Sequence, residues 1–150
     1  KRFNLIGETL DLMGVGRNQL VVAGTETPPF GVFAEKIDDE ALDALYNSSK
    51  FTFLLSATEG QGCTAIEAAI AGSFPILASD NPMAYELGLE EFVADPNPQS
   101  VARKINEIEG NGKYYASILT GLRDGFIKKY SVQAVAEQVI SRYDNFIVPF

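Results

Sequence analysis

Short apolar runs alternate with longer segments of helical periodicity along this chain of 150 residues, and this alternation constrains the fold more than any other feature. The clearest run, residues 51–56, is apolar on both faces, as the strands of a buried parallel sheet are. Strands alternating with helices predict an α/β fold, a parallel sheet with helices on both faces. Further strands are expected at residues 20–24, 31–34, 75–78 and 92–94.

The segments between these runs carry helix signals. Asp38 or Asp39 is a suitable N-cap for the helix that carries Leu42, Leu45 and Tyr46. Gly72 is a natural C-cap for a helix over residues 63–71. Helices are also expected at residues 3–13 and 83–87, and from about residue 99 onward, where breaks at 110–112 and near 130–131 leave a helical C-terminal tail. Residues 1–150 are predicted to form a single domain.

Charge and composition exclude several functions. The formal net charge of −8 argues against a nucleic-acid partner. The chain has no histidine, so serine–histidine or cysteine–histidine catalysis is excluded and a zinc site is not expected. Cys63 is the one cysteine and cannot form an internal disulfide, which favours a reducing, cytoplasmic location. A start at Lys1 rather than methionine is consistent with an excised piece of a longer protein.

The stretch from Glu59 to Glu67 is the best candidate site, because ligands of parallel sheets bind at the carboxyl ends of strands. Its glycines, Gly60 and Gly62, allow a tight turn, and the helix that follows directs free amides at a phosphate or diphosphate. Glu67 could hold the hydroxyl pair of a ribose and Glu59 the hydroxyls of a second sugar. Glycine turns also occur in this fold class without a ligand, and the helix dipole alone favours a glutamate in the first turn, so a structural role stays open for both.

Several motifs together resemble the large retaining glycosyltransferase family 4 and its GT-B relatives. Glu59 and Glu67 are separated by seven residues, as in that family's EX7E pattern. The surrounding sequence is similar in the same order over nearly the whole chain. Residues 42–46 resemble "LAALY", 56–62 "PS-x-x-EGFG", 67–76 "EAMACGTPVV", 78–82 "ASDIPG" and 93–96 "LVDP".

The resemblance implies a Rossmann-like fold, the C-terminal half of a GT-B enzyme, with a defined set of donor contacts. Glu59 would be the catalytic residue that contacts the transferred hexose, and Glu67 would bind the ribose. Lys36 and Ile37 would border the base, and Lys1 would bind phosphate, although a solvated surface role stays open for Lys36 and a functionless terminal position for Lys1. The backbone around four further residues would hold hexose and diphosphate: Gln61, Gly62, Cys63 and Thr64.

By the same resemblance the chain would act in polysaccharide biosynthesis, transferring a hexose from a nucleotide sugar to a glycan or lipid acceptor with retention of configuration. No metal or other cofactor is expected. The domain's first strand, its arginine and the N-terminal acceptor-binding domain are expected outside this chain, so the fragment alone should be inactive. That other half could associate peripherally with a membrane.

This sequence departs from the family pattern at Gln61, which replaces an aromatic residue, and at Cys63-Thr64. The alternatives are another GT-B activity, such as a nucleotide-sugar epimerase or a phosphorylase, and a non-catalytic flavodoxin-like binding module. The absence of histidine weighs against the epimerase. A phosphorylated receiver module would need an aspartate where Thr58-Glu59 stands.

Overall fold

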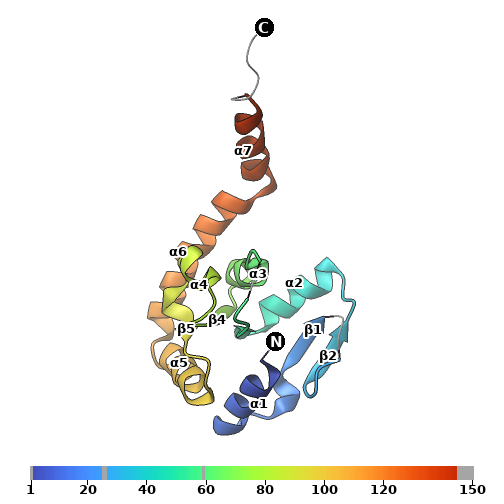
Figure 1. Cartoon of the computed structure of the whole chain (residues 1–150), viewed down its shortest axis with the longest axis vertical. Helices are drawn as coiled ribbons and strands as arrows, with labels where there is room; N and C mark the ends of the chain where they lie inside the picture. Colours follow the sequence, from blue (N-terminus) through green and yellow to red (C-terminus); the bar gives the residue numbers. More distant parts are fainter. Residues whose placement is uncertain (1, 25–26, 59, 145–150) are drawn as a thin grey trace.

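The computed structural model describes residues 2–24, 27–58 and 60–144 and has an α/β fold, as the alternating pattern predicted (Figure 1). Parallel strands are flanked by helices, and the chain closes with a helical tail, consistent with the Rossmann-like expectation. The helices are α1 (Phe3–Leu12), α2 (Asp39–Ser48), α3 (Cys63–Ala71), α4 (Met83–Glu86), α5 (Pro98–Gly110), α6 (Gly112–Tyr130) and α7 (Val132–Asp144), with two short 3₁₀ helices, η1 (Arg17–Gln19) and η2 (Glu90–Phe92). The strands are β1 (Val21–Gly24), β2 (Val32–Glu35), β3 (Phe51–Leu54), β4 (Phe74–Ala78) and β5 (Val93–Ala94).

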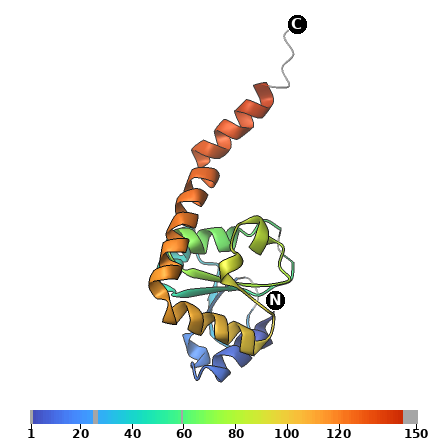
Figure 2. The ribbon, with the colours of Figure 1, turned by 90° about the vertical axis from the view of Figure 1, so that its left-hand side faces the viewer.

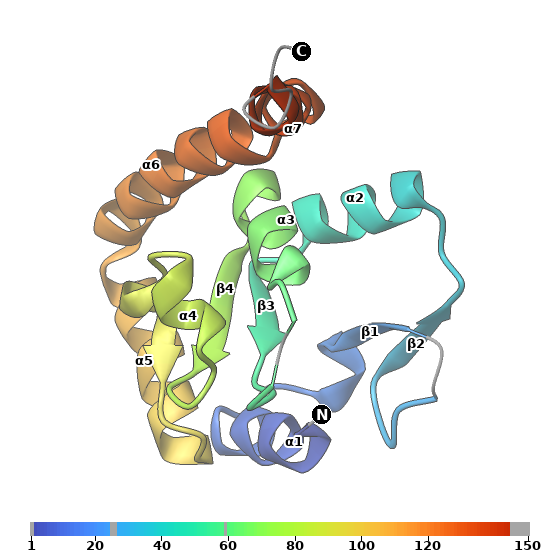
Figure 3. The ribbon, with the colours of Figure 1, turned by 45° about the horizontal axis from the view of Figure 1, so that its top comes forward.

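The strands form two parallel sheets rather than the single sheet that the sequence led us to expect. β1 pairs with β2, with Val21 opposite Val32, and the second sheet has the order β3-β4-β5, with Phe51 opposite Phe74. No ladder joins β1 to β3 in the described part of the chain. A cavity of about 1520 Å³, lined by both strands, lies where such a ladder would be. Figure 3 shows β1 and β2 apart from β3 and β4.

The core is centred on β4 and on the helices that cover it. Ile76 and Leu77 are fully buried, because β4 is the middle strand of its sheet and is covered on both faces. The helix α3 packs on this sheet through alanines, and Ala65 and Ala68 are also fully buried. These small side chains let the backbone of α3 approach the strands closely.

Two helix ends follow the predicted signals, whereas one predicted strand begins later than expected. The Asp38 carboxylate caps α2 by accepting a hydrogen bond from the amide of Ala41 at 2.8 Å, and Gly72 ends α3 in the left-handed conformation. Phe92, expected in a strand, lies instead at the end of η2, where its amide donates to the carbonyl of Leu89. That tight turn buries the Phe92 ring completely before β5 begins.

The C-terminal tail projects from the body of the molecule, as Figures 1 and 2 show. The helix α6 anchors it through buried residues such as Leu119 and Phe126, whereas α7 contributes no buried residue among those whose exposure is described. The expected apolar side of α7 is exposed, and Val132 is 89% accessible. None of the described helices combines the length and apolar character that would let it cross a membrane.

Candidate functional site

The turn between β3 and α3 depends on Gly62, which sits at the N-cap of α3 in the left-handed conformation, with φ of 66°. The position has no room for a side chain, because a Cβ there would lie 2.8 Å from Cδ1 of Leu87 and 3.3 Å from Cβ of Met83. Glycine is therefore required here both by backbone conformation and by space. The turn brings the start of α3 close to α4.

The amino end of α3 presents backbone donors at this turn. The amides of Ala65 and Ile66 both donate to the carbonyl of Gly62, at 2.9 and 3.1 Å. The amides of Cys63 and Thr64 come earlier in the first turn, where a helix supplies no internal partner, and no side chain caps this helix end. Free amides and the positive end of the helix dipole make such a terminus favourable for an anion such as a diphosphate.

One turn into α3, Glu67 is held by a tyrosine from α2. The Tyr46 hydroxyl donates a hydrogen bond to Oε2 of Glu67 at 3.1 Å. Burial of the phenol and then the Glu67 charge raise the pKa of Tyr46 to about 12, while a hydrogen bond with Thr64 acts in the opposite direction. Tyr46 therefore stays protonated at neutral pH and remains a donor to the carboxylate.

Lys36 and Ile37 follow β2. Lys36 has a positive φ of 51°, unusual outside glycine, and its ammonium lies 3.5 Å from Oε1 of Glu35. The Lys36 side chain is 80% exposed, so this ion pair contributes little to stability. The residue is a solvated lysine at the mouth of the cavity rather than a buried charge.

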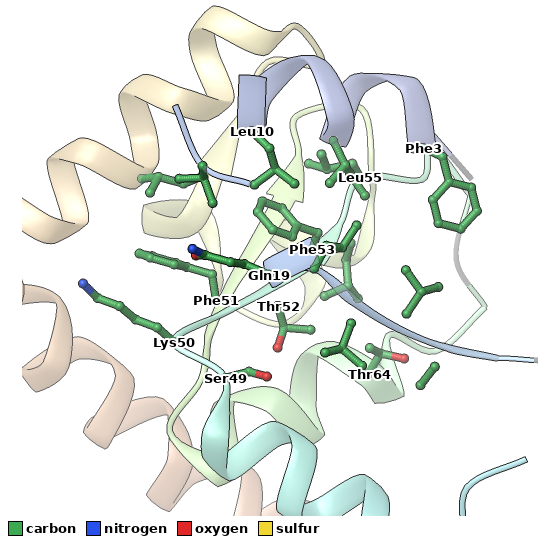
Figure 4. A pocket seen from close by; sticks show the side chains of 18 of the residues that line it. Phe3, Leu10, Gln19, Ser49, Lys50, Phe51, Thr52, Phe53, Leu55 and Thr64 are labelled. Carbon is green, nitrogen blue, oxygen red and sulfur yellow. The ribbon is translucent and has the colours of Figure 1, made fainter. Parts of the chain in front are cut away.

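The cavity between β1 and β3 gathers part of the predicted site. Lys36, Ile37, Thr64 and Glu67 all line it, together with Tyr46. The other predicted donor contacts of the α3 turn, Gln61, Gly62 and Cys63, are not among its lining residues. Figure 4 shows Thr64 on the side of the pocket opposite to Leu10 and Phe3, with the apolar side chain of Phe53 between them.

Gln61 and Cys63 lie on the exposed side of the turn. The Cys63 thiol is exposed and donates weakly to Oε1 of Gln61 at 3.8 Å. A lone cysteine with no base beside it in the sequence is expected to be buried or half-buried, and for Cys63 this expectation is wrong. Because α3 packs through its alanine face, its first residue points away from the core.

Two of the predicted site residues, Lys1 and Glu59, lie outside the described residues. Their neighbours are placed: Thr58 and Gly60 both lie in the exposed loop that connects β3 to α3. The roles expected for Lys1 and Glu59 therefore stay predictions.

Sequence reasoning missed Arg2, whose guanidinium joins three segments at the carboxyl edge of the sheet. Nη1 lies 3.1 Å from the carbonyl of Leu55 and 2.9 Å from Oδ1 of Asp80, and Nη2 lies 2.5 Å from Oδ2. This two-point hydrogen bonding from Arg2 lowers the pKa of Asp80. The partners are separated by 53 and 78 residues in the chain, so no local pattern signals the contact.

Sequence reasoning also missed the hydrogen bond from Tyr46 to Glu67, again because the two residues are distant in the chain. The sequence places Tyr46 only on the helix before β3, and 21 residues separate it from Glu67. Helical periodicity shows which face of α2 is apolar, but it does not show which neighbouring helix that face meets.

The fold and the site together indicate an α/β ligand-binding domain. At the carboxyl ends of its parallel strands lie a glycine turn and the uncapped amino end of a helix. The family described as "Glycosyl transferases group 1" matches residues 32–120, which is 89 of the 150 residues. The chain belongs to this family. No curated protein matches it.

The family match confirms the expectation of a glycosyltransferase, which moves a sugar from a donor to an acceptor. It runs from the first residue of β2 into α6 and so covers α3 and its turn. The finer assignment to family 4 and the roles expected from the EX7E spacing stay predictions.

Proposed function

We propose that this chain is the donor-binding domain of a retaining hexosyltransferase that uses a nucleotide-diphosphate sugar. The observation that carries the proposal is the uncapped amino end of α3 beside the Tyr46–Glu67 pair. Amides that favour a diphosphate and a carboxylate that favours a sugar diol stand one helical turn apart. A nucleotide sugar carries both groups in the same short stretch of its structure.

In this proposal the diphosphate lies on the amides of Cys63 and Thr64, and the ribose hydroxyls donate to the Glu67 carboxylate. Glu67 is one turn further along α3 and therefore does not have to face the phosphates, whose like charge would repel it. Lys36 and Ile37 border the base at the other side of the cavity. Gln61 and Gly62 hold the hexose end through their backbone.

The proposed roles of Lys1 and Glu59 rest on the family resemblance alone. Lys1 would add a positive charge for the phosphates, and Glu59 would contact the transferred hexose.

The proposed reaction breaks the bond between the anomeric carbon and the diphosphate oxygen, and the diphosphate leaves with the electron pair. The acceptor hydroxyl forms the new glycosidic bond on the same face of the sugar, and its proton passes to the departing diphosphate. The amides of α3 stabilise the negative charge that develops on the leaving group, without a metal ion. The acceptor, a glycan or a lipid, would be held by a second, N-terminal domain.

Donor binding tests this proposal. Calorimetry with UDP-, GDP- and ADP-sugars should show binding of at least one of them. Glu67→Ala should weaken that binding by about tenfold or more, equivalent to about 1.4 kcal/mol, because the diol loses its acceptor.

The matched control is Glu137→Ala, which removes an exposed glutamate on α7 and should leave affinity unchanged. Equal affinity in the Glu67 variant and the parent would overturn the ribose assignment. Failure of all three nucleotide sugars to bind would overturn the donor-binding proposal itself.

A further inference from the structure

A second cavity, of about 630 Å³, adjoins the cavity between β1 and β3, and Arg2 lines both of them. Its walls come from the first turns of α1, from the segment between β1 and β2, and from the turn between β5 and α5. The volume lies within the range of about 300–1,000 Å³ that is usual for small-molecule sites. The site proposed for the nucleotide sugar does not use this second cavity.

The apolar wall of the second cavity is made of rigid rings. The Phe3 ring is half-buried and meets the Phe30 ring edge-on, with the ring centroids 6.5 Å apart. Gly7 makes room for Phe30, because a Cβ at this position would lie 2.9 Å from Cζ of that ring. Three prolines supply the remaining rings: Pro29, Pro96 and Pro98. Such a wall is in place before a ligand binds, and the face of an aromatic ring attracts the C–H groups of a sugar.

Polar side chains that are not engaged elsewhere line the same cavity. Oδ1 of Asn97 caps α5 by accepting from the amide of Ser100 at 2.9 Å, and this contact leaves Nδ2 as a donor. Within the described residues, neither this Nδ2 group nor the side chains of Asn4 and Glu8 have a hydrogen bond or an ion pair. Asn4 and Glu8 are exposed and lie one turn apart on the same face of α1. Amides and a carboxylate together can bind the neighbouring hydroxyls of a sugar.

The charges around the second cavity favour a neutral ligand. The guanidinium of Arg2 is matched by Asp80, with which it forms two hydrogen bonds. Arg17, whose charge also acts on Glu8, is matched by Asp11 in the same way. The carboxylate of Glu8 therefore gives the cavity a net negative charge, which would repel a phosphate. A purely apolar ligand would cover Glu8 without giving it a hydrogen bond, which is costly.

We propose that the second cavity is a subsite for a neutral saccharide, one unit of a glycan acceptor. This inference deepens the proposed function and rests on it for the role of the saccharide as acceptor. The sugar ring packs on Phe3 and the prolines, Nδ2 of Asn97 donates to one of its oxygens, and Glu8 accepts from its hydroxyls. Because Arg2 lines both cavities, a glycan bound in the second one can extend toward the donor.

Saccharide binding to the 150-residue chain tests this inference. The probes are four neutral disaccharides: maltose, cellobiose, lactose and chitobiose. NMR spectra of the backbone amides follow each titration. At least one disaccharide should shift the amides of Asn4, Leu5 and Asn97, and the amides of Cys63 and Thr64 should stay unchanged.

Two conservative variants remove the polar contacts without disturbing the fold. Asn97→Asp keeps the oxygen that caps α5 and removes the donor, since aspartate caps a helix as well as asparagine does. Glu8→Gln removes the charge of an exposed side chain. Each variant should weaken disaccharide binding by about fivefold or more. The matched controls are Asn106→Asp, an exposed position on α5 outside the second cavity, and Glu67→Ala, and both should leave disaccharide affinity unchanged.

The absence of amide shifts with all four disaccharides would overturn the inference. So would shifts at Cys63 and Thr64 that disappear in Glu67→Ala, because the sugar would then bind in the donor cavity. Calorimetry with nucleotide sugars on the same sample separates this inference from the proposed function. A chain that binds a nucleotide sugar but no disaccharide loses only the second subsite. A chain that binds a disaccharide but no nucleotide sugar would overturn the assignment of the saccharide as an acceptor.

Discussion

The contact between Tyr46 and Glu67 shows how one side chain orients another. A carboxylate on the exposed face of α3 can adopt several rotamers, and the Tyr46 hydroxyl, 3.1 Å from Oε2, favours one of them. The hydrogen bond uses one carboxylate oxygen, and in the proposed donor complex the other would accept from the ribose. Tyr46 is in this sense a positioning residue for Glu67.

Tyr46→Phe should lower the affinity for the nucleotide sugar by about threefold to tenfold, because Glu67 loses the hydrogen bond that orients it. The fold should persist, since the ring keeps its packing. Calorimetry measures the affinity, and circular dichroism measures the fold. An unchanged affinity would show that Glu67 needs no partner.

The control for this variant is Tyr114→Phe, which changes an exposed tyrosine on α6 and should leave affinity unaltered. The pKa of Tyr46, raised to about 12, adds a second expectation. A phenol with a raised pKa loses its proton only at high pH. The stabilising hydrogen bond from Tyr46 to Glu67 is therefore fully present below pH 10, the ordinary pKa of tyrosine, and is lost as the pH rises towards 12. Tyr46 should therefore cause no pH dependence of binding between pH 6 and about pH 9.

At the scale of elements, the start of α3 depends on what surrounds Gly62. The sequence indicated a tight glycine turn, and the structure adds the second constraint, the close approach of Leu87 and Met83. The neighbouring Gly60 has no such constraint, because nothing lies within 4 Å of a Cβ built on it and its φ is not positive. The structure thus requires glycine at position 62 but not at position 60.

Gly62→Ala should reduce the free energy of unfolding by about 1–3 kcal/mol, through the left-handed φ and the clash with Leu87. Gly60→Ala should change it by less than about 0.5 kcal/mol. Urea unfolding of both variants measures the difference. Equal destabilisation would contradict the distinction between the two positions, and a stable Gly62→Ala protein would show that α4 can move away.

At the scale of the whole molecule, the body and the tail contribute unequally to stability. The buried core spans α1, the strands β3 to β5 and the helices α3 to α6. The large aliphatic residues of α7 are exposed and do not belong to this core. Those residues are Val132, Val135, Val139 and Ile140. A contiguous exposed apolar stripe of this kind favours self-association.

A chain that ends at Ser131 should keep its Tm within about 2 °C of the parent and should scatter less light at high concentration. Differential scanning calorimetry and light scattering check the two expectations. As a control for sensitivity, Phe126→Ala on α6 removes a buried ring and should destabilise the protein by about 3–5 kcal/mol. A large loss of Tm on truncation would mean that α7 packs on the body in solution.

The sequence by itself determined the secondary structure and much of the fold class. Apolar runs, the Asp38 cap and the glycines at 62 and 72 are local signals, because each acts within one helical turn or one strand. The ordered motifs were enough to indicate a glycosyltransferase, which the family match confirms.

Only the tertiary structure decided which distant residues meet. The Tyr46–Glu67 and Arg2–Asp80 contacts join different elements, and local periodicity contains no information on such partners. The division into two sheets was also beyond sequence reasoning, because an apolar run predicts a buried strand but not the neighbour that buries it. Which strands pair depends on how the layers assemble. The cavity between β1 and β3 therefore could not be predicted from the sequence of either strand.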